Sequence, residues 1–148
     1  MKDHPARVPR WPYLLVRGTS TSLGVLAVAQ AVFAGSFLDG RYDMLAVHAT
    51  TAAAMVAVAV VQAVTVVFLY RAGGPRRIML AGLLIPLILA GQAGLGMARV
   101  VSLHVPLGVL MVVGLLRLAA WAWRMPLPAR AAHPVGAVPD DRRVGALS

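Results

Sequence analysis

The chain has 148 residues, of which 59% are hydrophobic and 13% are charged, and its mean hydropathy is +0.78. About half of the residues are apolar in a soluble domain, so this composition predicts a membrane protein. The chain has no cysteine, which excludes disulfide bonds, iron–sulfur clusters, zinc–thiolate sites and covalent c-type haem. All 5 acids are aspartates outside the long apolar segments, so carboxylate catalysis or a proton relay inside the membrane is not expected.

The apolar residues form long segments, each close to the ~20 residues that a membrane-spanning helix needs. They predict spans at about residues 20–38, 44–70, 78–97 and 101–123, within a bundle of residues 18–124. Residues 1–17 combine basic and aromatic side chains, which is typical of a cytoplasmic flank, and the prolines of residues 125–148 predict a disordered cytoplasmic tail. Val32-Phe33-Ala34 also resembles a signal-peptide cleavage site, but the three later spans favour a retained first helix.

The basic residues predict the orientation of these spans. All but two of the 14 lysines and arginines lie in the N-terminal segment, the middle connection or the C-terminal segment, and the exceptions are Arg41 and Arg99. The positive-inside rule therefore predicts that both termini are cytoplasmic. The short connections favour an all-α, four-helix antiparallel transmembrane bundle. In such a protein the net charge of +9 indicates contacts with anionic lipid headgroups in the bilayer and no nucleic-acid partner.

Two histidines, His48 and His104, lie about one helical turn inside the second and fourth spans. Both spans begin on the outer side, so the two imidazoles are expected at a similar depth in the outer leaflet. Ionisable residues inside spans are rare and usually face the interior of a bundle. The other two histidines, His4 and His133, lie in the polar terminal segments.

The surroundings of the two histidines repeat. Both share the pattern His-x-x-x-small-x-x-Met, which is formed by His48, Ala52 and Met55 in one span and by His104, Gly108 and Met111 in the other. Spacings of four and seven residues place each set on one helix face. Gln30 and Gln92 lie in matching contexts in the two preceding spans. The pattern predicts a two-helix unit duplicated in parallel orientation about a pseudo-twofold axis along the membrane normal.

Two opposed imidazoles in a bundle core are suited to be the axial ligands of a six-coordinate haem b, iron-protoporphyrin IX. His48 and His104 are therefore the predicted metal ligands. The methionines of the repeat are two turns deeper, too far along the same helix to bind the same iron, and are expected to fill the core. Three further kinds of residue are expected to contact the cofactor. They are small residues that leave room for a flat ligand, side-chain amides, and arginines that pair with propionates: Ala52, Gly108, Gln30, Gln92, Arg41 and Arg99.

These positions resemble one four-helix half of the haem A synthase family. The resemblance covers about residues 24–116 and rests on Gln30, Gly35, His48, Gln92, Gly96 and His104. It implies a four-helix bundle with paired histidines toward the outer side and a haem b site. The chain has half the family's length and lacks its cysteine pair and its catalytic glutamate, so the resemblance argues against haem A synthesis.

The sequence therefore predicts a membrane-embedded haem b-binding protein that acts in electron transfer or haem handling with a redox partner or a larger membrane complex. The lack of an intramembrane acid favours a role without catalysis, and the Ala-, Val-, Gly- and Arg-rich composition suggests a bacterial plasma membrane. One alternative is a cofactor-free subunit in which the histidines and glutamines hydrogen-bond between helices. Another is a transition-metal ion bound by the histidines with Asp39, Asp43, Met44 or Met97. A homodimer is a further way to bring the histidines face to face.

Overall fold

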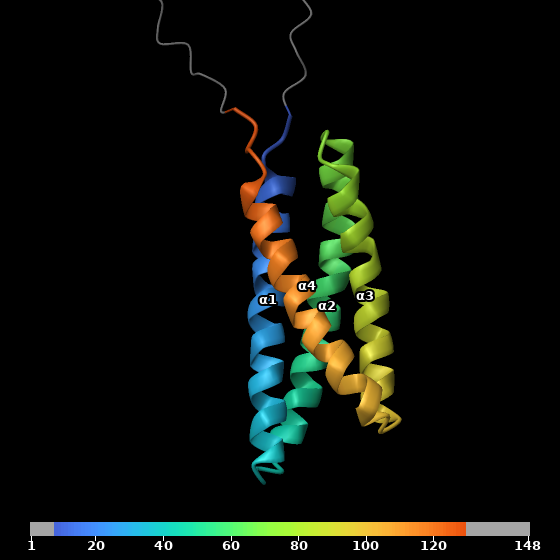
Figure 1. Ribbon diagram of the computed structural model, residues 1–148. Coiled ribbons are helices and arrows are strands. Elements are labelled where there is room, and N and C mark those ends of the chain that lie inside the picture. The colour runs from blue at the N-terminus through green and yellow to red at the C-terminus, as the bar shows by residue number, and fades with distance from the viewer. Residues whose placement is uncertain (1–7, 130–148) are drawn as a thin grey trace, which may run out of the picture.

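The computed structural model describes residues 8–129, which form α-helices joined by short turns (Figure 1). The helices are α1 (Trp11–Leu38), α2 (Met44–Arg71), α3 (Arg76–Met97) and α4 (Val101–Arg124). Each is long and apolar enough to cross a membrane. Even α3, with 22 residues, has a length of about 33 Å. The predicted all-helical architecture with four candidate membrane spans is confirmed for the described residues.

The helices follow the predicted spans closely except at the start of α1. This helix begins at Trp11 and not near residue 20, so the expected N-terminal flank is partly helical. Pro12 in the first turn favours a helix start, and Tyr13 and Val16 are buried against the other helices. Residues 126–129 follow α4 without regular structure. The predictions for residues 1–7 and 130–148, including disorder of the tail, lie outside the described residues.

The first three helices end in the same kind of turn. The residue after each C-cap has a positive φ: Gly40 at +90°, Gly73 at +85° and Arg99 at +59°. In each turn the amide of this residue and the next amide donate to carbonyls in the last turn of the preceding helix. This is the Schellman motif, whose left-handed position favours glycine. Among the residues that the structure describes, Arg99 is the one non-glycine residue with a positive φ.

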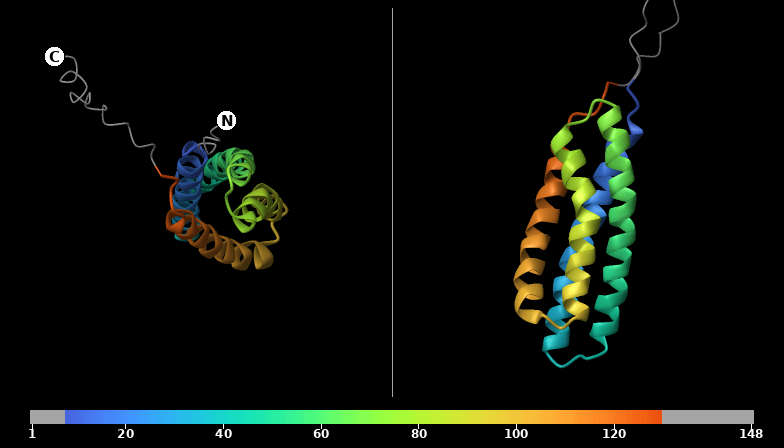
Figure 2. Two further views of the ribbon diagram at one scale, coloured as in Figure 1. Left: turned by 90° about the horizontal axis from the view of Figure 1, so that it is seen from above. Right: turned by 90° about the vertical axis from the view of Figure 1, so that its right-hand side faces the viewer.

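The chain reverses direction at each turn, and the helices surround a common interior (Figures 1 and 2). Consecutive helices are neighbours, and α4 closes the ring against α1, so α2 and α4 lie diagonally across the bundle. We call the end with the turns at residues 39–43 and 98–100 the histidine end. The opposite end, with the turn at residues 72–75, is the arginine end. In Figure 1, α4 is inclined across the bundle.

The packed core occupies the middle and the arginine end of the bundle. One cluster of buried side chains includes Leu23, Met55, Leu89 and Leu115, with one residue from each helix. A second cluster around Val66 and neighbouring residues lies at the arginine end. Toward the histidine end, the last buried residues of α1 and α3 are Gln30 and Leu89, and the first of α2 and α4 are Met55 and Leu115. The histidines therefore lie beyond the fully packed part of the described core.

Buried positions repeat between the two helix pairs, as the sequence pattern suggested. In α1 and α3 they follow the same spacing: Val16, Ser20, Leu23 and Ala27 correspond to Ile78, Gly82, Ile85 and Leu89. In α2 and α4, Ala59 corresponds to Leu115 and Val66 to Ala122. Many of the buried positions therefore repeat between the two helix pairs.

Two polar arrangements connect the helices near the arginine end. The buried Gln62 of α2 donates through Nε2 to Ser20 Oγ at 2.8 Å and accepts from the hydroxyl of Thr19, which satisfies polar groups in an apolar core. Arg17 donates to the carbonyl oxygens of Ala122, Trp123 and Met125 at 3.3, 3.3 and 2.6 Å. Arg17 therefore caps the C-terminal end of α4.

Candidate functional site

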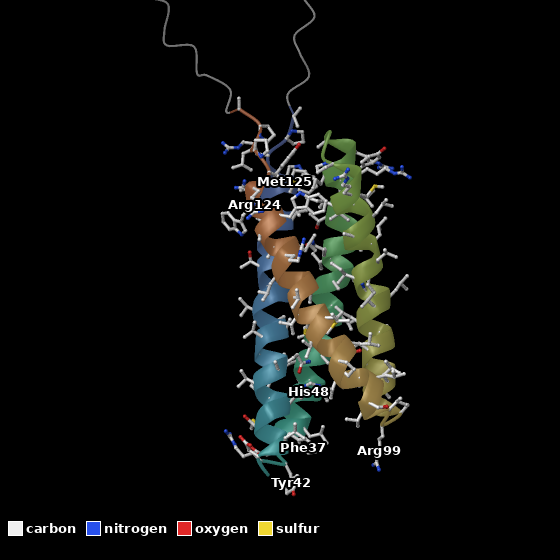
Figure 3. All side chains as sticks on the ribbon, viewed as in Figure 1. Phe37, Tyr42, His48, Arg99, Arg124 and Met125 are labelled. Carbon is white, nitrogen blue, oxygen red and sulfur yellow. The ribbon has the colours of Figure 1, made fainter. Side chains whose placement is uncertain are left out.

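His48 of α2 and His104 of α4 face each other across the bundle. Their ring centroids are 6.2 Å apart and the ring planes are inclined by 68°. Both side chains are half-buried and lie one turn inside their helices, near the histidine end, where Figure 3 labels His48. The two helices are diagonal in the bundle and not adjacent. The imidazoles therefore lie close together although the backbones that carry them are apart.

A glutamine of the preceding helix holds each histidine by two hydrogen bonds. The Gln30 side chain donates from Nε2 to the His48 carbonyl oxygen at 3.0 Å, and His48 Nδ1 lies 3.3 Å from the Gln30 carbonyl oxygen. In the second pair, Gln92 Nε2 donates to the His104 carbonyl oxygen at 2.5 Å, and His104 Nδ1 lies 2.9 Å from the Gln92 carbonyl oxygen. The two pairs therefore form the same reciprocal arrangement.

The hydrogen bonds at Nδ1 determine which ring nitrogen is free. A carbonyl oxygen only accepts hydrogen bonds, so Nδ1 of His48 and of His104 is the donor. In a neutral imidazole the proton on Nδ1 leaves a lone pair on Nε2. Metal-binding histidines commonly have this arrangement, with one nitrogen on the metal and the other donating to a carbonyl.

Small residues make room for these contacts, though not all in the expected way. A Cβ at Gly96 would lie 3.0 Å from Cε1 and 3.3 Å from Nδ1 of His104. A Cβ at Gly108 would lie 3.0 Å from Nε2 of Gln92. Gly108, expected to leave space for a flat ligand, is thus the contact surface for the glutamine amide, while Ala52 is half-buried one turn below His48. The space at the histidine ring itself depends on Gly96.

Arg41 and Arg99 lie at the histidine end but make no contact with the imidazoles in the described hydrogen bonds. Arg41 is exposed and its Nη2 lies 3.7 Å from the Met44 sulfur. In Figure 3 the exposed Arg99 side chain extends from its turn away from the helices. Pairing of these arginines with propionates thus stays a prediction.

The methionines and aspartates of the sequence hypothesis have different positions. Met55 is buried in the central cluster and Met111 packs against that cluster, so the prediction that they fill the core is confirmed. Within residues 8–129 no group of three histidine, cysteine, aspartate or glutamate side chains is brought together. Asp39 and Asp43 therefore do not join the histidines in a three-ligand metal site.

One buried polar atom next to the site has no hydrogen-bond partner in the described residues. Gln30 is 8% exposed, and its Oε1 is buried and unpaired. Its Nε2 is already engaged by the His48 carbonyl oxygen, so reversing the amide would place two oxygens together. Oε1 is thus an acceptor available to a donor group.

Two features of the site were not predicted from the sequence. The glutamines were expected near a cofactor, but their reciprocal hydrogen bonds with the histidines were not. Gly96 was noted as part of the family resemblance, without its contact with His104. The sequence signal for both features is the order Gln, Gly, His in the second helix pair. A glycine near the end of one helix lets a histidine of the neighbouring helix approach closely.

Comparison of the chain with protein-family models, with curated proteins and with solved structures finds no match. The chemical capacity of the site therefore rests on its own geometry. That geometry consists of two imidazoles from diagonal helices whose ring centroids are 6.2 Å apart and whose Nδ1 atoms are each held by a glutamine carbonyl oxygen.

Proposed function

We propose that the protein binds one haem b with His48 and His104 as its two axial ligands. The observation that supports this is the 6.2 Å separation of the ring centroids. Imidazole nitrogen binds a transition metal at about 2 Å, and the ring centre lies about 1 Å farther, so two rings on opposite sides of one metal have centroids about 6 Å apart. The inclination of 68° between the ring planes is compatible with this, because each ring is free to rotate about its metal–nitrogen bond.

Haem fits the donor set better than an isolated metal ion. Two histidines provide only two strong protein ligands, and within residues 8–129 no three-ligand group of histidine, cysteine or acid forms. A zinc site normally has three or four protein ligands. The macrocycle of haem supplies four nitrogens of its own, so that two histidines complete the coordination.

The residues around the imidazoles would position and shield the cofactor. Bound haem supplies a one-electron iron couple. The carbonyl oxygens of Gln30 and Gln92 orient each Nδ1 proton and so leave Nε2 as the nitrogen that would bind iron. The apolar cluster that contains Met55 excludes water from the deeper side. These properties support electron transfer with a redox partner or a larger membrane complex, or haem handling.

The proposed membrane arrangement is a duplicated pair of antiparallel helices. The repeated buried positions and the two Gln–His pairs support the duplication. The basic residues favour cytoplasmic termini in a bacterial plasma membrane. In that orientation His48 and His104 would hold the haem near the outer face, with Arg41 and Arg99 available to its propionates. The resemblance to one half of the haem A synthase family is compatible with this scaffold.

Absorption spectroscopy of the purified full-length protein tests the haem proposal. Protein from haem-replete cells is expected to have a Soret band and, when reduced, an α-band. His48→Ala and His104→Ala each remove one of the two axial ligands and are expected to lose the six-coordinate spectrum. His133→Ala, a histidine of the polar C-terminal segment, is the matched control and should keep it. Colourless wild-type protein, or His48→Ala with an unchanged spectrum, would contradict the proposal and favour a cofactor-free subunit.

A further inference from the structure

A groove between α1 and α4 lies apart from the histidine pair. It has a volume of about 290 Å³ and is lined by Thr21, Gly24, Val25, Val28, Leu116 and Ala119. Gly24 lets the helices come close, since a Cβ there would lie 3.3 Å from Leu116 Cδ2. Val25 and Val28 are 63% and 44% exposed. The groove is therefore apolar and open to the surface of the bundle that faces lipid.

A tryptophan and an arginine lie next to the groove, beside its lining residue Thr21. Trp123 Nε1 donates to Thr21 Oγ1 at 3.0 Å, and the Arg17 guanidinium carbon is 5.0 Å from the centre of the Trp123 ring. The hydrogen bonds of Arg17 to protein are to carbonyl oxygens. These oxygens are neutral, so Arg17 keeps its full positive charge.

Further positive charge lies at the same end. Arg10 precedes Arg17 by seven residues, which places both on one side of α1, and its Nε is buried with no partner in the described residues. Arg124 is exposed next to Trp123, and Figure 3 labels it beside Met125 at the arginine end. The acids of residues 8–129 are Asp39 and Asp43, at the histidine end. No carboxylate of the described residues therefore neutralises these arginines.

We propose that this groove binds an anionic phospholipid of the leaflet at the arginine end. One acyl chain lies along the valines of α1 and Leu116, and the phosphate lies near Arg17 and Arg10, where arginine forms charge-assisted hydrogen bonds with phosphate oxygens. A second copy of the chain is a poorer occupant, because contact through the same face would bring two sets of arginines together. The lipid site does not depend on haem binding.

Native mass spectrometry of the full chain in detergent tests the headgroup contact. The lipids are phosphatidylglycerol and phosphatidylcholine with identical acyl chains, and phosphatidylglycerol is expected to bind more tightly. One arginine near anionic lipid contributes about a fivefold difference in affinity, so Arg10→Gln and Arg124→Gln should each weaken phosphatidylglycerol binding about fivefold. Arg99→Gln makes the same charge change at the histidine end and should leave phosphatidylglycerol binding unchanged.

A second pair of variants tests the groove. Val28→Phe fills it and is expected to weaken binding of both lipids, whereas Val32→Phe changes an exposed valine one turn farther along α1, outside the lining residues, and should not. Equal affinity for the two lipids, or equal effects of Arg10→Gln and Arg99→Gln, would overturn the proposal. So would a dimer of delipidated protein that Val28→Phe dissociates, because the groove would then bind a second copy.

Discussion

Gly96 shows how much the site depends on single atoms. Its missing side chain leaves room for the His104 ring, since a Cβ would lie 3.0 Å from Cε1, closer than ordinary van der Waals contact. The ring is also held at Nδ1 by the Gln92 carbonyl oxygen at 2.9 Å. An added methyl group must therefore displace either the ring or the helix that carries it.

We expect Gly96→Ala to weaken haem binding by about tenfold, equivalent to ~1.4 kcal/mol. The added methyl group displaces the His104 ring from its position opposite His48. Titration of the purified apoprotein with haem, followed at the Soret band, measures the effect. Gly94→Ala is the matched control on the same helix, because a Cβ there meets nothing within 4 Å. Equal affinities of the two variants would show that ring placement does not depend on Gly96.

At the scale of helices, the three Schellman turns differ in one residue. Gly40 and Gly73 take the left-handed position without strain, whereas Arg99 takes it at φ +59°. A left-handed conformation costs a residue with a Cβ roughly 1–2 kcal/mol. Such strain is often found where a side chain has another role. At Arg99 the proposed role is a contact with a haem propionate at the start of α4.

Arg99→Gly is therefore expected to stabilise the apoprotein by about 1 kcal/mol while weakening haem binding. Glycine relieves the strain at φ +59° but removes the proposed propionate partner. Denaturant titration in detergent gives the free energy of unfolding, and haem titration gives the affinity. Arg41→Gly is the control for the stability change alone, since it removes a charge at the same end from a residue without a positive φ. A gain of stability in Arg41→Gly alone would contradict the strain argument.

At the scale of the whole molecule, charge and packing divide the bundle into two ends. The turn at residues 72–75 is flanked by Arg71, Arg76 and Arg77, and Arg17 and Arg124 lie at the same end. The described core is packed from this end to the middle, and its last buried layer lies just below the histidines. The basic end is expected on the cytoplasmic side, and the loosely packed end on the outer side.

Reporter fusions test this orientation. Alkaline phosphatase, which is active only outside the cytoplasm, should be active when fused after Asp43 and inactive when fused after Gly74. Substituting Arg71, Arg76 and Arg77 with glutamine removes the charges that retain the middle turn and should lower the contrast between the two fusions. Green fluorescent protein, which needs the cytoplasm to mature, is the complementary reporter. Activity after Gly74 with none after Asp43 would reverse the proposed topology.

The spans and the pairing of the histidines were predictable from the sequence for different reasons. Helix lengths follow from hydropathy, because a backbone in lipid must satisfy its hydrogen bonds within the helix. The start of α1 at Trp11 was not predicted, because Arg17 interrupts the apolar pattern of the sequence. The contacts of Arg17 with carbonyl oxygens at the end of α4 explain how this charged residue fits into the first turns of α1. His48 and His104 were identified by their rarity and by the repeated pattern around them.

The sequence by itself determined the helical class, the approximate spans, the repeat and the two histidines as the candidate site. The tertiary structure decided that the centroids of the two rings lie 6.2 Å apart and that a glutamine carbonyl oxygen holds Nδ1 of each ring. It also decided that Gly108 lies against the Gln92 amide and does not border an open space. The sequence does not specify these contacts because lipid and bundle core are both apolar. Hydrophobicity therefore sets helix length but not rotation or tilt, and these depend on close packing between helices.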